Sequence, residues 1–191
     1  MRLVIMGAPG AGKGTQAQIL AADFGIPHVA TGVIFRQNVD SETPLGLRAK
    51  AYMDRGELVP DEIVIGMVAE RLAETDAAQG FILDGFPRTV PQAEALEIFL
   101  QERDTPLDVV IRFEVPEEEL LARLEARREQ EHRTDDDTEV IRKRLVEYRS
   151  KTAPLVTFYS ERGLLRDVHA LGSIEDVAAR TKELLADLDP V

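Results

Sequence analysis

The sequence predicts a three-layer α/β fold, in which a central five-stranded parallel sheet carries helices on both faces. Short apolar segments with the length of strands alternate along the chain with longer segments of helical periodicity. The first apolar segment leads through a glycine-rich turn directly into a helical pattern. The 191 residues, of which 44% are hydrophobic, are enough for one compact domain with a substantial core.

Five apolar segments are expected to form the strands of the sheet. They are Arg2–Met6, Pro27–Ala30, Phe81–Leu83, Val109–Phe113 and Leu164–His169. The expected helices are Lys13–Phe24, Gly32–Val39, Leu45–Arg55, Pro60–Thr75, Val90–Glu102, Pro116–Arg128, Thr138–Arg162 and Ser173–Leu188.

Residues typical of helix ends mark several of these boundaries. Pro44 separates the second helical segment from the third. The charge of Asp61, and the three glutamates that follow Pro116, suit the positive end of a helix dipole. Ser173 is a favourable N-cap for the last helix. The polar segment Glu129–Asp137 has no apolar period and is predicted to form a loop.

The composition excludes several classes of function. A formal net charge of −12 argues against a nucleic-acid partner or an anionic membrane surface. No apolar run approaches the roughly 20 residues that cross a bilayer. The apolar run before Gly7 is shorter than the apolar region of a secretory signal peptide, which has about 7–15 residues. The absence of cysteine excludes a disulfide framework and a thiolate metal site. We therefore expect a cytoplasmic protein.

The strongest functional signal is the segment Gly7–Thr15, with the sequence GAPGAGKGT, which follows a strand and opens a helix. Its glycines allow successive backbone amides to point into one concavity, to which the helix N-terminus adds partial positive charge. Lys13 adds a full charge that suits the β- and γ-phosphates of a nucleotide. The segment predicts a P-loop and hence the P-loop NTPase fold. The alternative, a glycine-rich turn that binds nothing, does not require this order of glycines, lysine and threonine.

Glycine stands at position 14, where serine or threonine usually follows the lysine, and Thr15 comes one place later. Together with Asp84-Gly85-Phe86-Pro87-Arg88, this variant resembles the nucleoside monophosphate kinases. Further motifs resemble the adenylate kinase family over nearly the whole chain. They are Ala30-Thr31-Gly32 with Arg36, Leu58-Val59-Pro60, Gln92, the run Arg142–Tyr148 and the run Thr152–Leu155. The resemblance implies reversible transfer of the terminal phosphoryl group from MgATP to AMP, giving two ADP.

The resemblance also implies where each nucleotide binds. ATP would contact Gly10, Ala11, Gly12, Lys13, Gly14, Thr15, Arg123, Arg127 and Gly172. AMP would contact Thr31, Arg36, Glu57, Leu58, Val59, Gly85, Phe86, Pro87, Arg88, Gln92, Arg133 and Arg144. Lys13, Arg88, Arg133 and Arg144 would stabilise the transferred group. Within a single domain covering residues 1–191, residues 30–59 would form an AMP-binding lobe and residues 126–136 a short lid.

Side-chain chemistry suits two of the roles that the resemblance implies. Gln92 lies one helical turn after Arg88, and its amide donates and accepts at once, which matches the 6-amino group and N1 of adenine. Arg123 would be a flat platform for the adenine of ATP. Taken singly, a solvated glutamine and ordinary surface arginines paired with acidic neighbours are the alternatives. Arg128 and Arg142 are interpreted as solvated or paired.

Asp84 ends a predicted strand, at the edge where parallel sheets place ligands. We expect it to hold Mg²⁺ through water, because magnesium gives up its hydration reluctantly. An N-cap or turn aspartate is the alternative. Zinc is not expected, because cysteine is absent and His132 stands alone in the polar loop. His28 and His169 have neither triad nor metal spacing, so structural roles are expected for them.

One residue departs from the family pattern. Val33 stands where the family commonly has aspartate after Thr-Gly, and the missing carboxylate would weaken AMP binding or alter closure of the lobe. Two other functions compete with adenylate transfer. A kinase for UMP/CMP or GMP is disfavoured by Thr31 and Gln92, and an ATP-binding switch without transfer would not need several acceptor-side arginines. The expected partners are ATP, AMP and ADP, with no nucleic acid and no membrane, and the chain is expected to be a monomer.

Overall fold

The computed structural model describes residues 1–131 and 138–188 and contains one parallel sheet. Its five strands lie in the order β2-β3-β1-β4-β5. They are β1 (Arg2–Gly7), β2 (His28–Ala30), β3 (Phe81–Asp84), β4 (Val109–Glu114) and β5 (Leu165–His169). The fold class predicted from the sequence is confirmed. In the described part of the chain, no helix is both long and apolar enough to cross a membrane.

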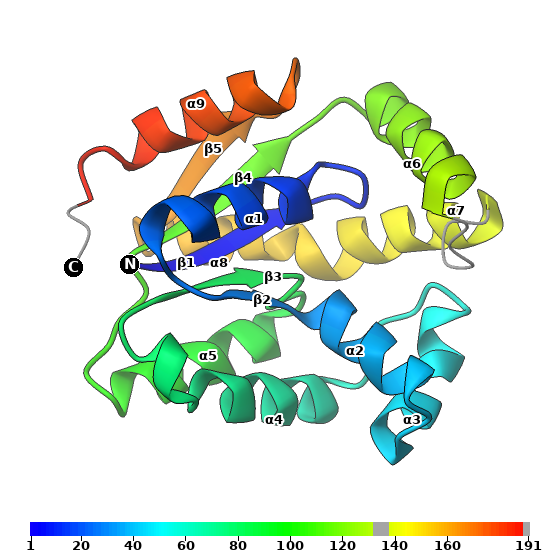
Figure 1. Cartoon of the computed structure of the whole chain (residues 1–191), viewed down its shortest axis with the longest axis horizontal. Helices are drawn as coiled ribbons and strands as arrows, with labels where there is room; N and C mark the ends of the chain where they lie inside the picture. Colours follow the sequence, from blue (N-terminus) through cyan, green and yellow to red (C-terminus); the bar gives the residue numbers. More distant parts are fainter. Residues whose placement is uncertain (132–137, 189–191) are drawn as a thin grey trace.

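Helices cover both faces of this sheet (Figure 1). They are α1 (Lys13–Phe24), α2 (Thr31–Asp40), α3 (Pro44–Met53), α4 (Asp61–Leu72), α5 (Val90–Gln101), α6 (Glu117–Glu131), α7 (Thr138–Glu147), α8 (Pro154–Ser160) and α9 (Ile174–Leu185). A short 3-10 turn covers Thr75–Ala77. Helices α2 and α3 lie beside the sheet rather than on it.

The core is divided by the sheet into two clusters, because successive side chains of a strand point to opposite faces. On β1, Leu3 and Ile5 join the cluster that packs against α1, α6, α7 and α9. Val4 and Met6 join the cluster on the other face, which includes side chains of α4, α5 and α8. All four side chains are almost fully buried. The sheet is therefore a rigid support from which loops at its carboxyl edge can present polar groups.

Several helix boundaries form as the sequence predicts. The Thr43 hydroxyl accepts a hydrogen bond from the amide of Gly46 at 3.0 Å and caps α3, in which Pro44 is the first residue. Ser173 caps α9 in a reciprocal capping box with Asp176. Strand β3 ends one residue later than predicted, so that Asp84 itself belongs to the strand.

The predicted single helix Thr138–Arg162 is wrong. The segment consists of α7, a π-helical turn over Tyr148–Thr152, and α8, which ends at Ser160. Proline at position 154 has no amide hydrogen and its ring crowds the preceding turn, so the regular ladder is interrupted before it. The amide of Ala153 instead donates to the Tyr148 carbonyl at 2.8 Å.

The predicted loop Glu129–Asp137 begins too early, because α6 continues to Glu131. Glutamate, alanine, arginine and glutamine have high helix propensity, so the segment stays helical without an apolar period. Residues 132–137 lie outside the described part of the chain, and the predicted lid is thus described only in its first residues.

Candidate active site

The site lies at the carboxyl edge of the sheet, where β1 is flanked by β3 on one side and β4 on the other. A cavity of about 470 Å³ opens there, and we call it the donor cavity. It connects the P-loop to residues of β3, α2, α6 and α7. Its polar and charged lining includes Lys13, Thr15, His28, Arg36, Asp84, Arg88, Arg123, Arg127 and Arg144.

Two smaller cavities lie beside the donor cavity. The first has a volume of about 120 Å³ and is lined by Lys13, Glu57, Pro87 and Arg144, among others. The second, which we call the base pocket, has a volume of about 50 Å³. Its lining includes Thr31, Leu58, Val59 and Gln92. Gly32, Gly85 and Arg88 line all three cavities. The residues predicted for the donor and the acceptor therefore meet in adjoining spaces.

The P-loop backbone requires glycine at defined positions. Gly10 and Gly12 have φ angles of 86° and 84°, in the region that side chains rarely adopt. A Cβ at position 10 would also stand 3.0 Å from the carbonyl oxygen of Leu120 and 3.0 Å from Cγ of Leu124. The loop thus packs closely against α6 and leads into α1, whose N-terminus borders the donor cavity.

Lys13 is held beneath the loop. Its Nζ donates to the carbonyl oxygens of Gly7 and Ala8, at 3.0 Å each. Burial lowers the pKa of Lys13 to about 8, and repulsion from Arg88 and Arg144 acts in the same direction against the attraction of Asp84. The ammonium group is thus desolvated and surrounded by other cations, an environment that a polyphosphate would relieve.

Asp84 faces Lys13 across the donor cavity. Burial alone would raise the pKa of Asp84, but the hydrogen bond from His28 and the positive charges of Lys13 and Arg88 outweigh it and hold this pKa below its usual value. Nε2 of His28 lies 3.3 Å from Oδ2 of Asp84. A Cβ at position 14 would stand 3.5 Å from the same oxygen, so the unusual Gly14 leaves room beside this carboxylate.

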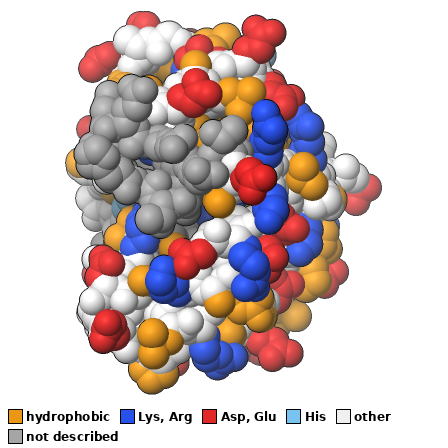
Figure 2. Space-filling view, turned by 90° about the vertical axis from the view of Figure 1, so that its right-hand side faces the viewer, with side chains coloured by type: hydrophobic (Ala, Val, Ile, Leu, Met, Phe, Trp, Pro, Cys, Tyr) orange, Lys and Arg blue, Asp and Glu red, His pale blue; other side chains and the backbone are white. Residues whose placement is uncertain are grey.

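The arginines of the site come from several elements. Nε of Arg88 donates to the Gly85 carbonyl at 2.8 Å, which fixes the side chain above the turn after β3. Arg123 is held by Glu119 at 2.7 Å and by the Ala170 carbonyl at 3.0 Å. Arg36 and Arg144 enter the donor cavity from α2 and α7. The end of the molecule on which α2, α3, α6 and α7 lie displays many Lys and Arg side chains among Asp and Glu (Figure 2).

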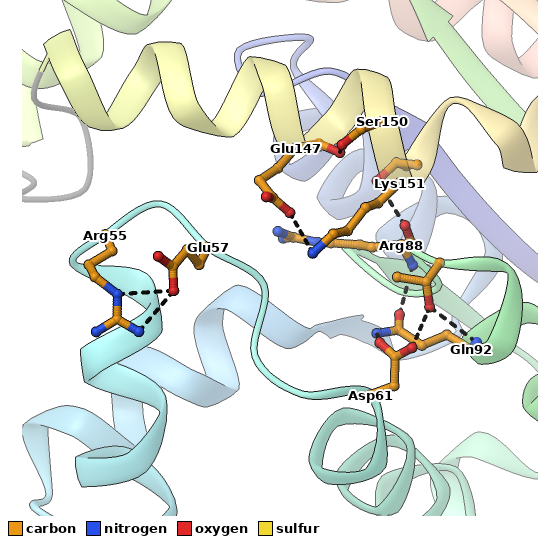
Figure 3. Close-up of polar contacts among 10 residues, drawn as sticks. Arg55, Glu57, Asp61, Arg88, Gln92, Glu147, Ser150 and Lys151 are labelled. Atoms are coloured by element: carbon orange, nitrogen blue, oxygen red, sulfur yellow. Dashed lines mark hydrogen bonds and ion pairs between the residues drawn. The ribbon is translucent and has the colours of Figure 1, made fainter.

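Polar contacts organise the base pocket (Figure 3). Oε1 of Gln92 accepts from the backbone amide of Arg88 at 2.7 Å, and Nε2 of Gln92 donates to Oδ1 of Asp61 at 2.7 Å. The Thr31 hydroxyl donates to the Gly85 carbonyl at 3.0 Å, which leaves its oxygen able to accept. The Glu57 carboxylate pairs with Arg55 instead of entering the pocket, so Glu57 borders it mainly through its backbone.

Some predicted site residues lie elsewhere. Ala11 and Phe86 are buried, and Gly172 lies against Asp176 and Arg180 without lining any of the three cavities. Arg133 lies outside the described residues, as does His132. Among the described residues, no group of three or more His, Asp or Glu could form a metal cluster.

Two residues of the site were not predicted from the sequence. His28 was expected to be structural, yet it contacts Asp84. Asp61 was interpreted only as a helix-end charge, although its carboxylate also binds Gln92. Parallel pairing of β2 with β3 brings His28 near Asp84, so a strand order would have revealed the first contact. Asp61 and Gln92 are 31 positions apart, and no local pattern links them.

The chain is similar to proteins of one family. A family model described as "Adenylate kinase" matches residues 5–164. An adenylate kinase of Thermobifida fusca is 56% identical over 185 residues, covering 97% of this chain and 98% of that protein. Adenylate kinases of Carboxydothermus hydrogenoformans and Bacillus subtilis are 48% and 47% identical, over 97% and 98% of this chain and 99% of each relative. The alignment with the Bacillus protein spans 215 positions, more than the 191 residues here, so that relative contains insertions.

Proposed function

The chain belongs to the adenylate kinase family and transfers the terminal phosphoryl group of MgATP to AMP reversibly, giving two ADP, and we propose that the three adjoining cavities hold the two nucleotides during this transfer. The observation that carries the assignment of residues is that Lys13, Arg88 and Arg144 border the same donor cavity.

The P-loop is proposed to hold the phosphates of ATP. Gly10, Gly12, Lys13, Gly14 and Thr15 line the donor cavity, and the N-terminus of α1 adds partial positive charge there. Lys13 leaves its two carbonyl partners, or shares them, when phosphate oxygens arrive. Arg123 and Arg127 supply further contacts, with Arg123 kept in place by Glu119 as a platform for the adenine. A contact between the Gly172 backbone and ATP stays a prediction from the resemblance.

AMP is proposed to bind between the base pocket and the donor cavity. Its adenine would face Thr31 and Gln92, and the backbone of residues 57–59 would border the base and ribose. Its phosphate would lie near Arg36, Arg88 and Arg144 in the donor cavity. Arg133, which lies beyond the described residues, keeps its predicted role as a further phosphate ligand.

Catalysis is proposed to consist of alignment and charge stabilisation. The acceptor phosphate is largely ionised near neutral pH, with a second pKa of about 6, so no general base has to remove a proton. Lys13, Arg88 and Arg144 would stabilise the transferred group by charge-assisted hydrogen bonds. Their arrangement in one partly enclosed space would also limit attack by water.

Asp84 suits the water-mediated binding of Mg²⁺. Its carboxylate is largely buried in the donor cavity, and its lowered pKa keeps it ionised near neutral pH. A magnesium ion bound with ATP neutralises phosphate charge. His28 and Gly14 position this carboxylate and leave space around it. Independence from zinc, a monomeric state and a cytoplasmic location remain predictions from the sequence.

Two segments are proposed to close over the bound nucleotides. Residues 30–59 form a lobe whose base, at Thr31, is bonded to the turn after β3. Residues 126–136 form the second segment, the short lid that the family resemblance implies. Closure would bring additional arginines to the phosphates and exclude water.

A coupled assay of ADP formation tests these assignments. Purified protein with MgATP is given AMP, CMP, UMP or GMP in turn, and we expect a marked preference for AMP. A preference for another monophosphate would overturn the assignment of the base pocket. Tight ATP binding without acceptor-dependent ADP would contradict the assigned arginine roles.

A further inference from the structure

The orientation of the Gln92 amide is determined by its two neighbours. The side chain is 1% exposed, and each end of its amide is engaged at 2.7 Å (Figure 3). The Asp61 carboxylate can only accept, so it requires the NH₂ end. The Arg88 amide can only donate, so it requires the oxygen end. A Gln92 amide rotated by 180° would lose both bonds. Its oxygen would then face the Asp61 carboxylate, and its NH₂ group would face the N–H of Arg88.

Asp61 is itself held in position. Its second oxygen, Oδ2, accepts from the Thr89 hydroxyl at 2.9 Å, and the same hydroxyl caps the helix that carries Gln92. The Arg88 carbonyl accepts from the Thr152 hydroxyl at 2.9 Å, which fixes the other anchor. The amide is thus held between the start of α4 and the start of α5, two segments that lie far apart in the sequence.

Held in this way, the amide leaves a defined edge for a ligand. A primary amide has two N–H donors and two acceptor sites on oxygen, so one of each remains after the two internal bonds. The 6-amino group and N1 of adenine offer a donor and an acceptor to this edge. A 6-oxo purine, such as hypoxanthine or guanine, offers the reverse pattern, with an acceptor at O6 and a donor at N1–H.

We propose that Asp61 is a positioning residue that sets the selectivity of the acceptor site for 6-amino over 6-oxo purine monophosphates. The inference rests on the proposed role of Gln92 in base recognition. Asp61 acts through Gln92: it prevents the amide from rotating to accommodate a 6-oxo purine. A purely structural Asp61 would support α4 without affecting the choice of base.

The test compares AMP with IMP, which differs from AMP in these two positions of the base. Asp61→Asn keeps the shape of the side chain but can donate as well as accept, so it no longer enforces one amide orientation. We expect the ratio of kcat/KM for AMP over IMP to fall about tenfold, the effect of one charge-assisted hydrogen bond. KM for ATP should stay unchanged. Both substrates are assayed on one preparation, so partial unfolding does not affect the ratio.

Glu62→Gln is the matched control. Glu62 is the exposed neighbour in the same first turn of α4, so this variant removes the same charge from the helix end. Its AMP/IMP ratio should equal that of the wild type. An equal fall in both variants would indicate a helix-end charge effect and would overturn the proposal.

Gln92→Leu separates the inference from the function on which it rests. If this variant abolishes the preference for AMP, Gln92 recognises the base, and adding Asp61→Asn should then change nothing further. An Asp61→Asn variant that keeps the wild-type ratio, while Gln92→Leu loses it, overturns the inference alone. A Gln92→Leu variant that keeps the ratio overturns both.

Discussion

Arg88 occupies the point at which the three cavities adjoin, and its guanidinium is directed by the Gly85 carbonyl. A cation placed there can contact the acceptor phosphate and the transferred group at once. We expect Arg88→Ala to lower kcat at least tenfold, which corresponds to about 1.4 kcal/mol of transition-state stabilisation. Steady-state kinetics with saturating MgATP and AMP provide the measurement.

Arg103→Ala is the control for loss of an arginine. Arg103 is exposed in the turn after α5, where its guanidinium stacks on the ring of Phe99 at 3.6 Å, and it lines none of the three cavities. Its turnover should match the wild type. An Arg88→Ala enzyme with unchanged kcat would remove Arg88 from the catalytic group.

The lowered pKa of Lys13 predicts that ATP binding depends on pH. Its pKa in the ligand-free protein is lowered to about 8, mainly by burial, against an ordinary value of 10.5. Because phosphates bind the charged form, affinity is retained below pH 8 and declines as the pH rises above it, by up to about tenfold per pH unit. Calorimetric titration of ATP between about pH 7 and pH 9.5 measures this decline.

Lys13→Arg is the control for this decline, because arginine stays charged throughout the range. Its affinity for ATP is expected to be weaker but nearly independent of pH. Parallel profiles for the wild type and Lys13→Arg would show that Lys13 is not the titrating group. The same burial should make the free energy of unfolding rise as the pH increases from about 8 to 10.5, because in that range the unfolded chain binds more protons than the folded chain.

At the scale of elements, the lobe that we propose for residues 30–59 depends on close packing between α2 and α3. A Cβ at Gly46 would stand 2.1 Å from the carbonyl oxygen of Asn38 and 2.6 Å from the amide nitrogen of Val39, both backbone atoms. We expect Gly46→Ala to force the helices apart and lower the free energy of unfolding by about 1–3 kcal/mol. Thermal unfolding and KM for AMP are measured, and KM should rise because the lobe borders the base pocket.

Gly66→Ala makes the same substitution where no atom lies within 4 Å of the new Cβ. Gly66 lies inside α4, so alanine should raise the free energy of unfolding by about 0.5–1 kcal/mol. KM for AMP should not change. If both variants shifted the melting temperature in the same direction, helix propensity rather than packing between α2 and α3 would govern position 46.

The sequence predicts the elements better than it predicts the contacts between them. The P-loop turn into α1, the break before α3 at Pro44 and the cap at Ser173 follow from local patterns, and each forms as expected. The break at Tyr148–Thr152 was missed, although Pro154 signals it, because apolar periodicity continues across the segment. The contact of Asp61 with Gln92 depends on how α4 and α5 pack, which no single segment encodes.

At the scale of the molecule, the nucleotide site is positively charged although the chain as a whole is acidic. The chain has 35 acidic and 23 basic residues, yet the described residues that line the donor cavity include six cations and, as the acidic member, Asp84. Such a distribution focuses positive potential on the nucleotide site while the remaining surface repels itself. Screening by salt should therefore act in opposite directions on binding and on stability.

We expect the melting temperature to rise as NaCl increases from about 0.05 M to about 1 M, because the Debye length falls to about 3 Å and the acidic surface is screened. Over the same range KM for ATP and for AMP should rise, because their phosphates lose attraction to the cavity. Differential scanning fluorimetry and steady-state kinetics on one set of buffers provide both measurements. Arg88→Ala should show a smaller rise in KM for AMP, since one of the screened charges is absent. A melting temperature that fell with salt would mean that attractive ion pairs, such as Arg112 with Asp167, outweigh the repulsion expected from a net charge of −12.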